Sequence, residues 1–132
     1  MTIEINNLTK FRLDKKLYTG LAKKVIKGEN KEIELKNLSI AFVSTTEIKK
    51  ANKKYRGKDN PTDVLSFGES LNEILICPDV VKKNAEKFGV SFKNEMAKIL
   101  IHGALHLCGY DHEKSEKEAE VMEQKENFYL NK

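Results

Sequence analysis

The stretch from Ile101 to His112 reads IHGALHLCGYDH, and it holds all three histidines of the chain. His102 and His106 are four residues apart, so on a helix their rings project from one face. Gly109 allows the chain to turn left-handed and leave that helix, which returns His112 toward the first two rings. The spacing therefore predicts a helix that ends near Gly109 and three imidazoles that meet at one point.

Three neutral imidazoles are a zinc ligand set with the fourth position open, as in catalytic sites. Nickel, copper and iron also accept imidazole, so the residues alone leave the metal open. Cys108 is the obvious fourth ligand of a closed structural site, but it comes two residues after His106 and faces nearly the other side of the helix. We therefore expect an open site, with Cys108 and Cys77 reduced and buried as small apolar residues.

Segments with strand and helix patterns alternate along the rest of the chain. Strands are predicted at residues 2–6, 38–43, 63–67 and 73–77, and helices at about 13–28, 44–55, 78–89, 91–107 and from 115 onward. Ser44, Ser91 and Ser115 stand where helix N-caps are expected. The short link 68–72 predicts an antiparallel hairpin. The order predicts one α+β domain over residues 1–132, with a small mixed sheet of about four strands, about five helices and the metal site on a helix of the C-terminal half.

The composition sets outer limits on function. A hydrophobic share of 39% suffices for one ordinary core. No apolar run approaches the ~20 residues of a membrane helix, and the first residues lack the pattern of a signal peptide, so we expect a cytoplasmic protein without a membrane partner. The net charge of +4 fits a solvated surface as well as a nucleic-acid-binding face.

The spacing His-x3-His-x5-His is also that of the metzincin proteases. In those enzymes a glutamate follows the first histidine and serves as general base. Gly103 occupies that position here. Without a carboxylate beside the metal, peptide hydrolysis lacks its proton acceptor, and the sequence disfavours a protease.

Two segments together resemble one family. The stretch from His102 to His112 resembles the HGxLHLxGYDH signature of the YbeY family of bacterial RNA-maturation endoribonucleases. Upstream, the stretch from Asn52 to Phe67, NKKYRGKDNPTDVLSF, is similar to that family's second signature, NxxYRGxDxPTDVLSF. The resemblance spans about residues 38–112. Gly68 stands where the family usually has proline.

The resemblance implies a zinc-dependent endoribonuclease that prefers single-stranded RNA and acts in maturation of the 16S rRNA 3′ end and in ribosome quality control. It implies Zn²⁺ binding by His102, His106 and His112, and a functional role for Arg56. The implied partners are the rRNA precursor in the small ribosomal subunit, a small-subunit ribosomal protein and the Era GTPase, with no DNA partner. Whether a 2′-hydroxyl or a water attacks the phosphorus stays open.

Arg56 is notable apart from the family. Only Arg12 and Arg56 are arginines in a chain that otherwise uses lysine. A guanidinium is the better bidentate partner for phosphate, although a solvated arginine that caps the end of its own helix is the alternative. Lysines near it that are expected to steer an RNA backbone are Lys49, Lys50, Lys53, Lys54 and Lys58. The acidic last helix should confine RNA to one face.

Two smaller motifs have plain structural interpretations. Residues 61–63, Pro-Thr-Asp, are typical of a turn that enters a strand, with Asp63 or Thr62 satisfying the loop backbone. Asp111 either orients the ring of His112 or caps the final helix. Two rival functions remain: a zinc peptidase or other zinc hydrolase, and a ribosome-associated RNA-binding factor whose zinc is mainly structural.

Overall fold

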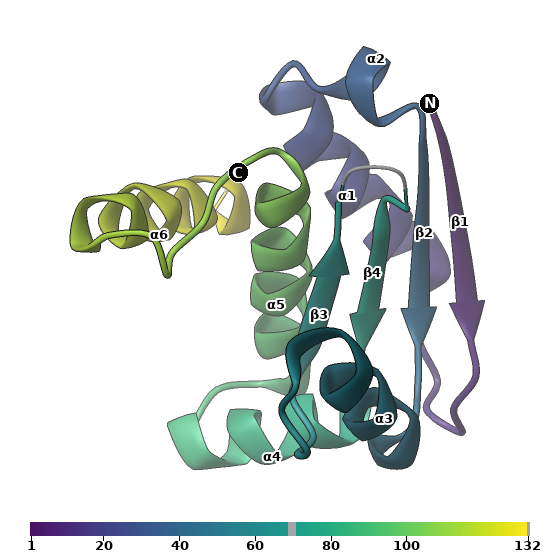
Figure 1. Ribbon diagram of the computed structural model, residues 1–132. Helices are drawn as coiled ribbons and strands as arrows, with labels where there is room; N and C mark the ends of the chain where they lie inside the picture. Colours follow the sequence, from purple (N-terminus) through teal and green to yellow (C-terminus); the bar gives the residue numbers. More distant parts are fainter. Residues whose placement is uncertain (69–70, 132) are drawn as a thin grey trace.

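A four-stranded mixed sheet in the order β1-β2-β4-β3 forms the centre of the computed structural model, which describes residues 1–68 and 71–131 (Figure 1). β2 pairs parallel with both β1 and β4. β3 pairs antiparallel with β4, which confirms the predicted hairpin. Two residues of its link, 69 and 70, lie outside the described residues. The strands are β1 (Thr2–Asn7), β2 (Asn37–Phe42), β3 (Val64–Phe67) and β4 (Glu73–Ile76).

Alternation along the strands divides the core between the two faces of the sheet. In β2, Ile40 and Phe42 are fully buried on the face that carries the main core, beside Ile74 and Ile76 of β4. The intervening Leu75 packs on the opposite face in a smaller cluster. Because side chains alternate with period two, one apolar strand can supply both clusters.

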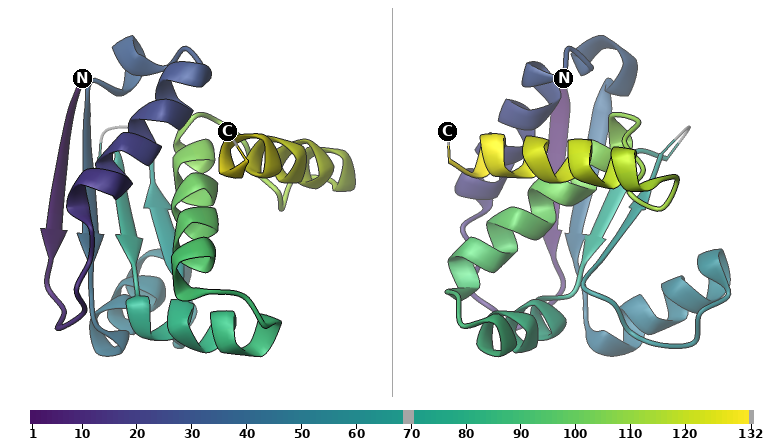
Figure 2. Two further views of the ribbon diagram at one scale, coloured as in Figure 1. Left: turned by 180° about the vertical axis from the view of Figure 1, so that it is seen from behind. Right: turned by 90° about the vertical axis from the view of Figure 1, so that its left-hand side faces the viewer.

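The helices form a layer on each side of the sheet. α1 and α5 cover the main-core face, α3 lies on the opposite face, and α6 crosses the outer side of α5 (Figure 2). α4 packs against α5 near one end of the sheet (Figure 1). The bounds are α1 (Lys15–Gly28), α2 (Glu32–Leu35), α3 (Thr45–Arg56), α4 (Pro78–Phe88), α5 (Phe92–Leu107) and α6 (Glu116–Leu130). None of the helices in the described ranges is long and apolar enough to cross a membrane.

The predicted class, one α+β domain with a small mixed sheet, is confirmed. A continuous core joins the sheet to α1, α5 and α6, and the predicted caps Ser44, Ser91 and Ser115 each accept a backbone N–H at the start of a helix. The described chain has six helices where about five were expected. The additional one, α2, has four residues and buries only Leu35, so it is too short to produce a helical hydrophobic period.

Candidate metal centre

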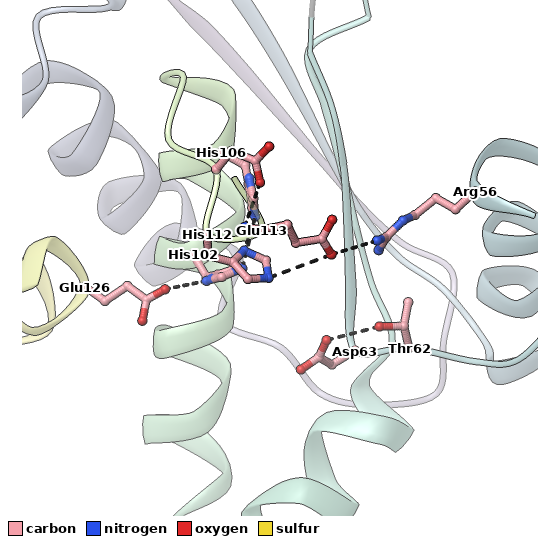
Figure 3. A network of polar contacts seen from close by, with 9 residues as sticks. Arg56, Thr62, Asp63, His102, His106, His112, Glu113 and Glu126 are labelled. Atoms are coloured by element: carbon pink, nitrogen blue, oxygen red, sulfur yellow. Dashed lines mark hydrogen bonds and ion pairs between the residues drawn. The ribbon is translucent and has the colours of Figure 1, made fainter. Parts of the chain in front are cut away.

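The three histidines meet at one point, as their spacing predicts (Figure 3). His106 Nε2 lies 3.2 Å from His102 Nε2 and 3.1 Å from His112 Nδ1. One ring nitrogen from each residue falls within 4.8 Å of the others. In the described part of the chain, this is the one group of histidine, cysteine or acidic side chains with the geometry to hold a metal ion.

A Schellman turn after α5 positions the ring of His112. The N–H of Gly109 donates to the carbonyl of His106 at 3.0 Å, and that of Tyr110 donates to Leu105 at 3.2 Å. Gly109 has φ +105°, a conformation that a residue with a Cβ rarely adopts. The turn reverses the chain, so His112 faces the two rings on the helix.

A buried carboxylate holds this turn against the rest of the domain. Glu29, at the end of α1, accepts hydrogen bonds from Tyr110 Oη at 2.6 Å and Lys125 Nζ at 3.2 Å, and it contacts Tyr129 Oη. Burial alone would raise the pKa of Glu29, but these hydrogen bonds and the Lys125 charge outweigh it and lower that pKa. The same group thus ties α1, the turn and α6 together.

The donor set suits a transition metal. Burial, reinforced by the neighbouring His102 and His112 rings, lowers the pKa of His106 and favours its neutral form, which coordinates metals. Cys77 and Cys108 are free and buried, as expected. Burial raises the pKa of Cys108 to about 11, so its thiol stays protonated and is a poor ligand. The expectation that Cys108 does not close the site is confirmed.

Gly103 faces away from the rings and into the sheet. A Cβ at this position would lie 3.1 Å from Ile74 Cγ2, 3.2 Å from Ser66 Oγ and 3.3 Å from Val64 Cγ2. Ser66 Oγ also donates to the Gly103 carbonyl at 3.1 Å, which fixes the helix on the strand. A glutamate would therefore not fit at position 103. This packing is the structural reason that the glutamate base of the metzincins has no place here.

Arg56 approaches the histidines from the other side of the sheet edge. It ends α3, where Gly57 leaves the helix with φ +70°, and its Nη2 donates to Glu113 Oε1 at 3.0 Å. Glu113 Oε1 also lies 4.0 Å from His112 Nε2. Arg56 therefore points across to the metal centre rather than over the end of its own helix (Figure 3).

A cleft of about 680 Å³ joins these parts. The three histidines, Arg56 and all of β3 line it, so the edge strand of the sheet forms one wall. Asp63 also lines the cleft, and its carboxylate contacts Thr62 Oγ1 at 3.4 Å and Asn84 Nδ2 at 3.5 Å. The expectation that these side chains satisfy the loop backbone is corrected, because Asp63 and Thr62 contact each other and Asn84 instead.

Asp111 has neither of the roles considered for it. Its Oδ1 accepts the N–H of Glu113 at 3.0 Å and so stabilises the loop after the turn. Ser115, not Asp111, caps α6 by accepting the N–H of Glu118 at 3.1 Å. The Asp111 carboxylate therefore accepts a backbone hydrogen bond within the loop that precedes α6.

Glu126, like Glu113, is a residue of the site that the sequence did not predict. It lies on α6, and its Oε1 contacts Nδ1 of His102, the ring nitrogen that points away from the other histidines. Met122, Glu126 and Tyr129 are the buried residues of α6, at helical spacing. A carboxylate inside an apolar helical stripe was the signal that could have identified it.

The predicted lysines lie on exposed positions of α3 and of the loop after it, and none of them is among the residues that line the cleft. Lys50 pairs with Glu47 at 3.8 Å, and Lys53 pairs with Asp59 at 3.9 Å, so part of their charge is offset locally. Lys54 lies over the ring of Tyr55. The positive charge near Arg56 is therefore moderate.

Comparisons with known proteins identify the family of this chain. The family model described as endoribonuclease YbeY matches residues 4–132. Endoribonuclease YbeY of Thermotoga neapolitana is 41% identical over 119 residues, which cover 88% of this chain and 80% of that protein. The Petrotoga mobilis protein of the same name is 41% identical, with coverage of 98% and 94%. The solution structure of TM1509 from Thermotoga maritima superposes with a TM-score of 0.71 at 34% identity, covering 97% of this chain and 86% of that one. A family match over nearly the whole chain, joined to the three-histidine cleft, shows that this protein belongs to the YbeY family of endoribonucleases.

Proposed function

We propose that this protein is a zinc-dependent endoribonuclease that cleaves single-stranded RNA during maturation of the 16S rRNA 3′ end and in ribosome quality control. The observation that carries the proposal is the placement of Arg56 opposite three converging histidine nitrogens in one cleft. Residues 1–132 act in this proposal as one hydrolase domain. The family supports the RNA substrate, because its members are described as endoribonucleases.

His102, His106 and His112 would hold the metal through one nitrogen each. When bound there, Zn²⁺ would supply Lewis-acid polarisation of a phosphoryl oxygen and lower the pKa of a coordinated water. All three histidines line the cleft, so a substrate in the cleft would reach a metal held by them. Three imidazoles would also bind other transition metals. Elemental analysis of protein purified without a His tag therefore identifies the bound metal.

Arg56 would bind the scissile phosphate and offset the charge that develops on it. Its guanidinium already holds one oxyanion in the cleft, the carboxylate of Glu113. A carboxylate and a phosphate present similar oxygen pairs to a guanidinium. The exposed lysines of α3 would guide the RNA backbone toward this point, and the acidic α6 would repel it from the far side.

Cellular context follows from the family alone. We propose a cytoplasmic protein that acts on the rRNA precursor of the small subunit, with a small-subunit ribosomal protein and the Era GTPase as partners. Association with purified small subunits, measured by co-sedimentation at two salt concentrations, tests the first of these partners.

Cleavage assays separate this function from its two rivals. Zinc-loaded parent protein is incubated with single-stranded RNA, double-stranded RNA and an unfolded protein, and we expect cleavage of the first only. Cleavage of the unfolded protein alone would identify a peptidase. Gly103 argues against that outcome, because its packing on β3 and β4 leaves no place for a glutamate base.

Matched arginine variants test the catalytic role. Arg56→Ala should remain folded and metal-loaded but cleave RNA ~100-fold more slowly, the usual cost of removing a charge-stabilising donor. Arg12→Ala removes the same side chain from an exposed position outside the cleft and should match the parent. If Arg56→Ala cleaves as fast as Arg12→Ala, the assignment of Arg56 is wrong. If His106→Ala only unfolds the protein or weakens RNA binding while Arg56→Ala stays active, the zinc is structural.

A further inference from the structure

Glu126 is a carboxylate in a position that normally holds an apolar residue. It is 9% exposed and lies on the buried stripe of α6, between Met122 and Tyr129. A buried carboxylate is costly unless a partner compensates for the lost hydration. The partner is His102, on the adjacent helix α5.

The contact selects one nitrogen of the ring. Glu126 Oε1 meets Nδ1 of His102, while Nε2 of the same ring faces His106 Nε2 at 3.2 Å. With its hydrogen on Nδ1, His102 would donate to this carboxylate and keep the Nε2 lone pair directed at the centre. Figure 3 shows the ring between Glu126 on one side and the two other histidines on the other.

Among the residues that the structure describes, no equally buried carboxylate contacts either of the other two rings. Glu113 is 4.0 Å from His112 Nε2, and its side chain is 58% exposed, against 11% for that of Glu126. Water screens the exposed contact much more strongly than the buried one. Glu126 is therefore the carboxylate with the strongest control over a histidine of this centre.

We propose that Glu126 is a positioning residue that fixes His102 as its Nδ1–H tautomer, strengthens metal binding and couples the docking of α6 to occupancy of the metal centre. A carboxylate on the outer nitrogen makes the inner nitrogen more basic and holds the ring in place. The inference rests on the proposed metal site. It adds a specific residue from another helix and a consequence for the stability of that helix.

The test measures metal affinity rather than RNA cleavage. Zn²⁺ affinity is determined by competition with a chromophoric chelator for the parent, Glu126→Gln and Glu126→Ala. We expect affinity to fall 10–100-fold in Glu126→Gln and further in Glu126→Ala, because the amide keeps an acceptor but loses the charge. Glu123→Gln, an exposed glutamate on the same helix, should bind Zn²⁺ as the parent does.

Two further readouts remain informative if a variant unfolds. Nitrogen chemical shifts of His102 in the metal-free parent should report a protonated Nδ1, and a protonated Nε2 would overturn the proposal. Hydrogen exchange of α6 amides in the parent should slow on addition of Zn²⁺. In Glu126→Ala this protection should be lost.

The possible failures are distinguishable. If the parent binds Zn²⁺ and Glu126→Gln binds it equally well, Glu126 has only a structural role and the inference is wrong, while the proposed function stands. If the parent binds none of the transition metals offered, both fall together. Equal losses in Glu126→Gln and Glu123→Gln would indicate a general charge effect and would also overturn the inference.

Discussion

Arg56 and Glu113, 57 positions apart in the sequence, form an ion pair 3.0 Å long between the end of α3 and the loop after the third histidine. Their side chains are 38% and 58% exposed, so water and salt weaken the pair. A pair of this kind contributes little to folding, and an incoming phosphate can displace it. Glu113 therefore occupies the position at which the proposed function places the substrate.

Removing the Glu113 charge should favour RNA binding. In Glu113→Gln we expect KM for single-stranded RNA to fall several-fold, because Arg56 no longer has a competing anion. The free energy of unfolding should change by less than ~1 kcal/mol. Steady-state cleavage and urea titration measure the two quantities.

The matched control for that variant is Glu4→Gln, which makes the same charge change on β1, at the edge of the sheet opposite β3. It should leave KM near the parent value. A rise of KM in Glu113→Gln, together with weaker Zn²⁺ binding, would instead mean that Glu113 supports His112.

The surroundings of Gly103 and Gly20 predict whether an alanine at each position lowers or raises the stability of the protein. Gly103→Ala gains helix propensity of ~1 kcal/mol but presses a methyl group against three atoms at 3.1–3.3 Å. Overpacking costs ~1–3 kcal/mol, so we expect a net loss of stability of about 1 kcal/mol in urea unfolding. Gly20→Ala, at an exposed position of α1 with no neighbour within 4 Å, should be more stable than the parent by ~0.5–1 kcal/mol. Equal effects of the two substitutions would contradict the close approach of α5 to the sheet.

Glu29 predicts sensitivity to acid. Its pKa is lower in the folded protein than the ordinary glutamate value of 4.5, so the folded state binds fewer protons than the unfolded state. This stabilisation is present above that value and is lost as the pH falls through the folded pKa. Glu29→Gln should therefore be less stable than the parent at pH 7, and the difference should shrink as the pH falls below about 4.5. Urea titrations over a pH series measure it, and a difference that is constant with pH would refute the assignment.

Metal should stabilise the folded protein by mass action. A ligand that binds only the folded state adds ~2.7 kcal/mol at a free concentration 100 times its Kd. The Tm of the parent should thus rise with Zn²⁺ and return after chelation. His106→Ala should show a much smaller rise, and an equal rise in both proteins would place the stabilising metal elsewhere.

Local features of the sequence were sufficient for much of this structure. The helix caps Ser44, Ser91 and Ser115 and the turn at Gly109 depend on neighbours within a few residues, so their positions could be predicted. The grouping of the histidines was predictable for the same reason, because one helix and one turn contain all of them.

Contacts between distant elements could not be predicted in this way. Glu29 meets Tyr110 across 81 positions, and Glu126 meets His102 across 24, so only the packing of α1, α5 and α6 brings them together. Arg56 was identified from its residue type and a resemblance, but its contact with Glu113 depends on how α3 lies against the sheet edge. Asp111 shows the converse: two plausible roles were considered, and the local loop geometry imposed a third.

The wall of the cleft has a consequence for association between protein chains. β3 is an edge strand, and edge strands invite extended segments of other proteins to pair with their free backbone groups. A strand from another chain that paired with β3 would also block access to the histidines. With only four residues, β3 offers a partner strand few places to bond, and charged Arg56 and Asp63 stand beside it. Resistance to aggregation and access to the site thus depend on the same short strand, so mutations that lengthen or neutralise this edge should reduce solubility before they alter the fold.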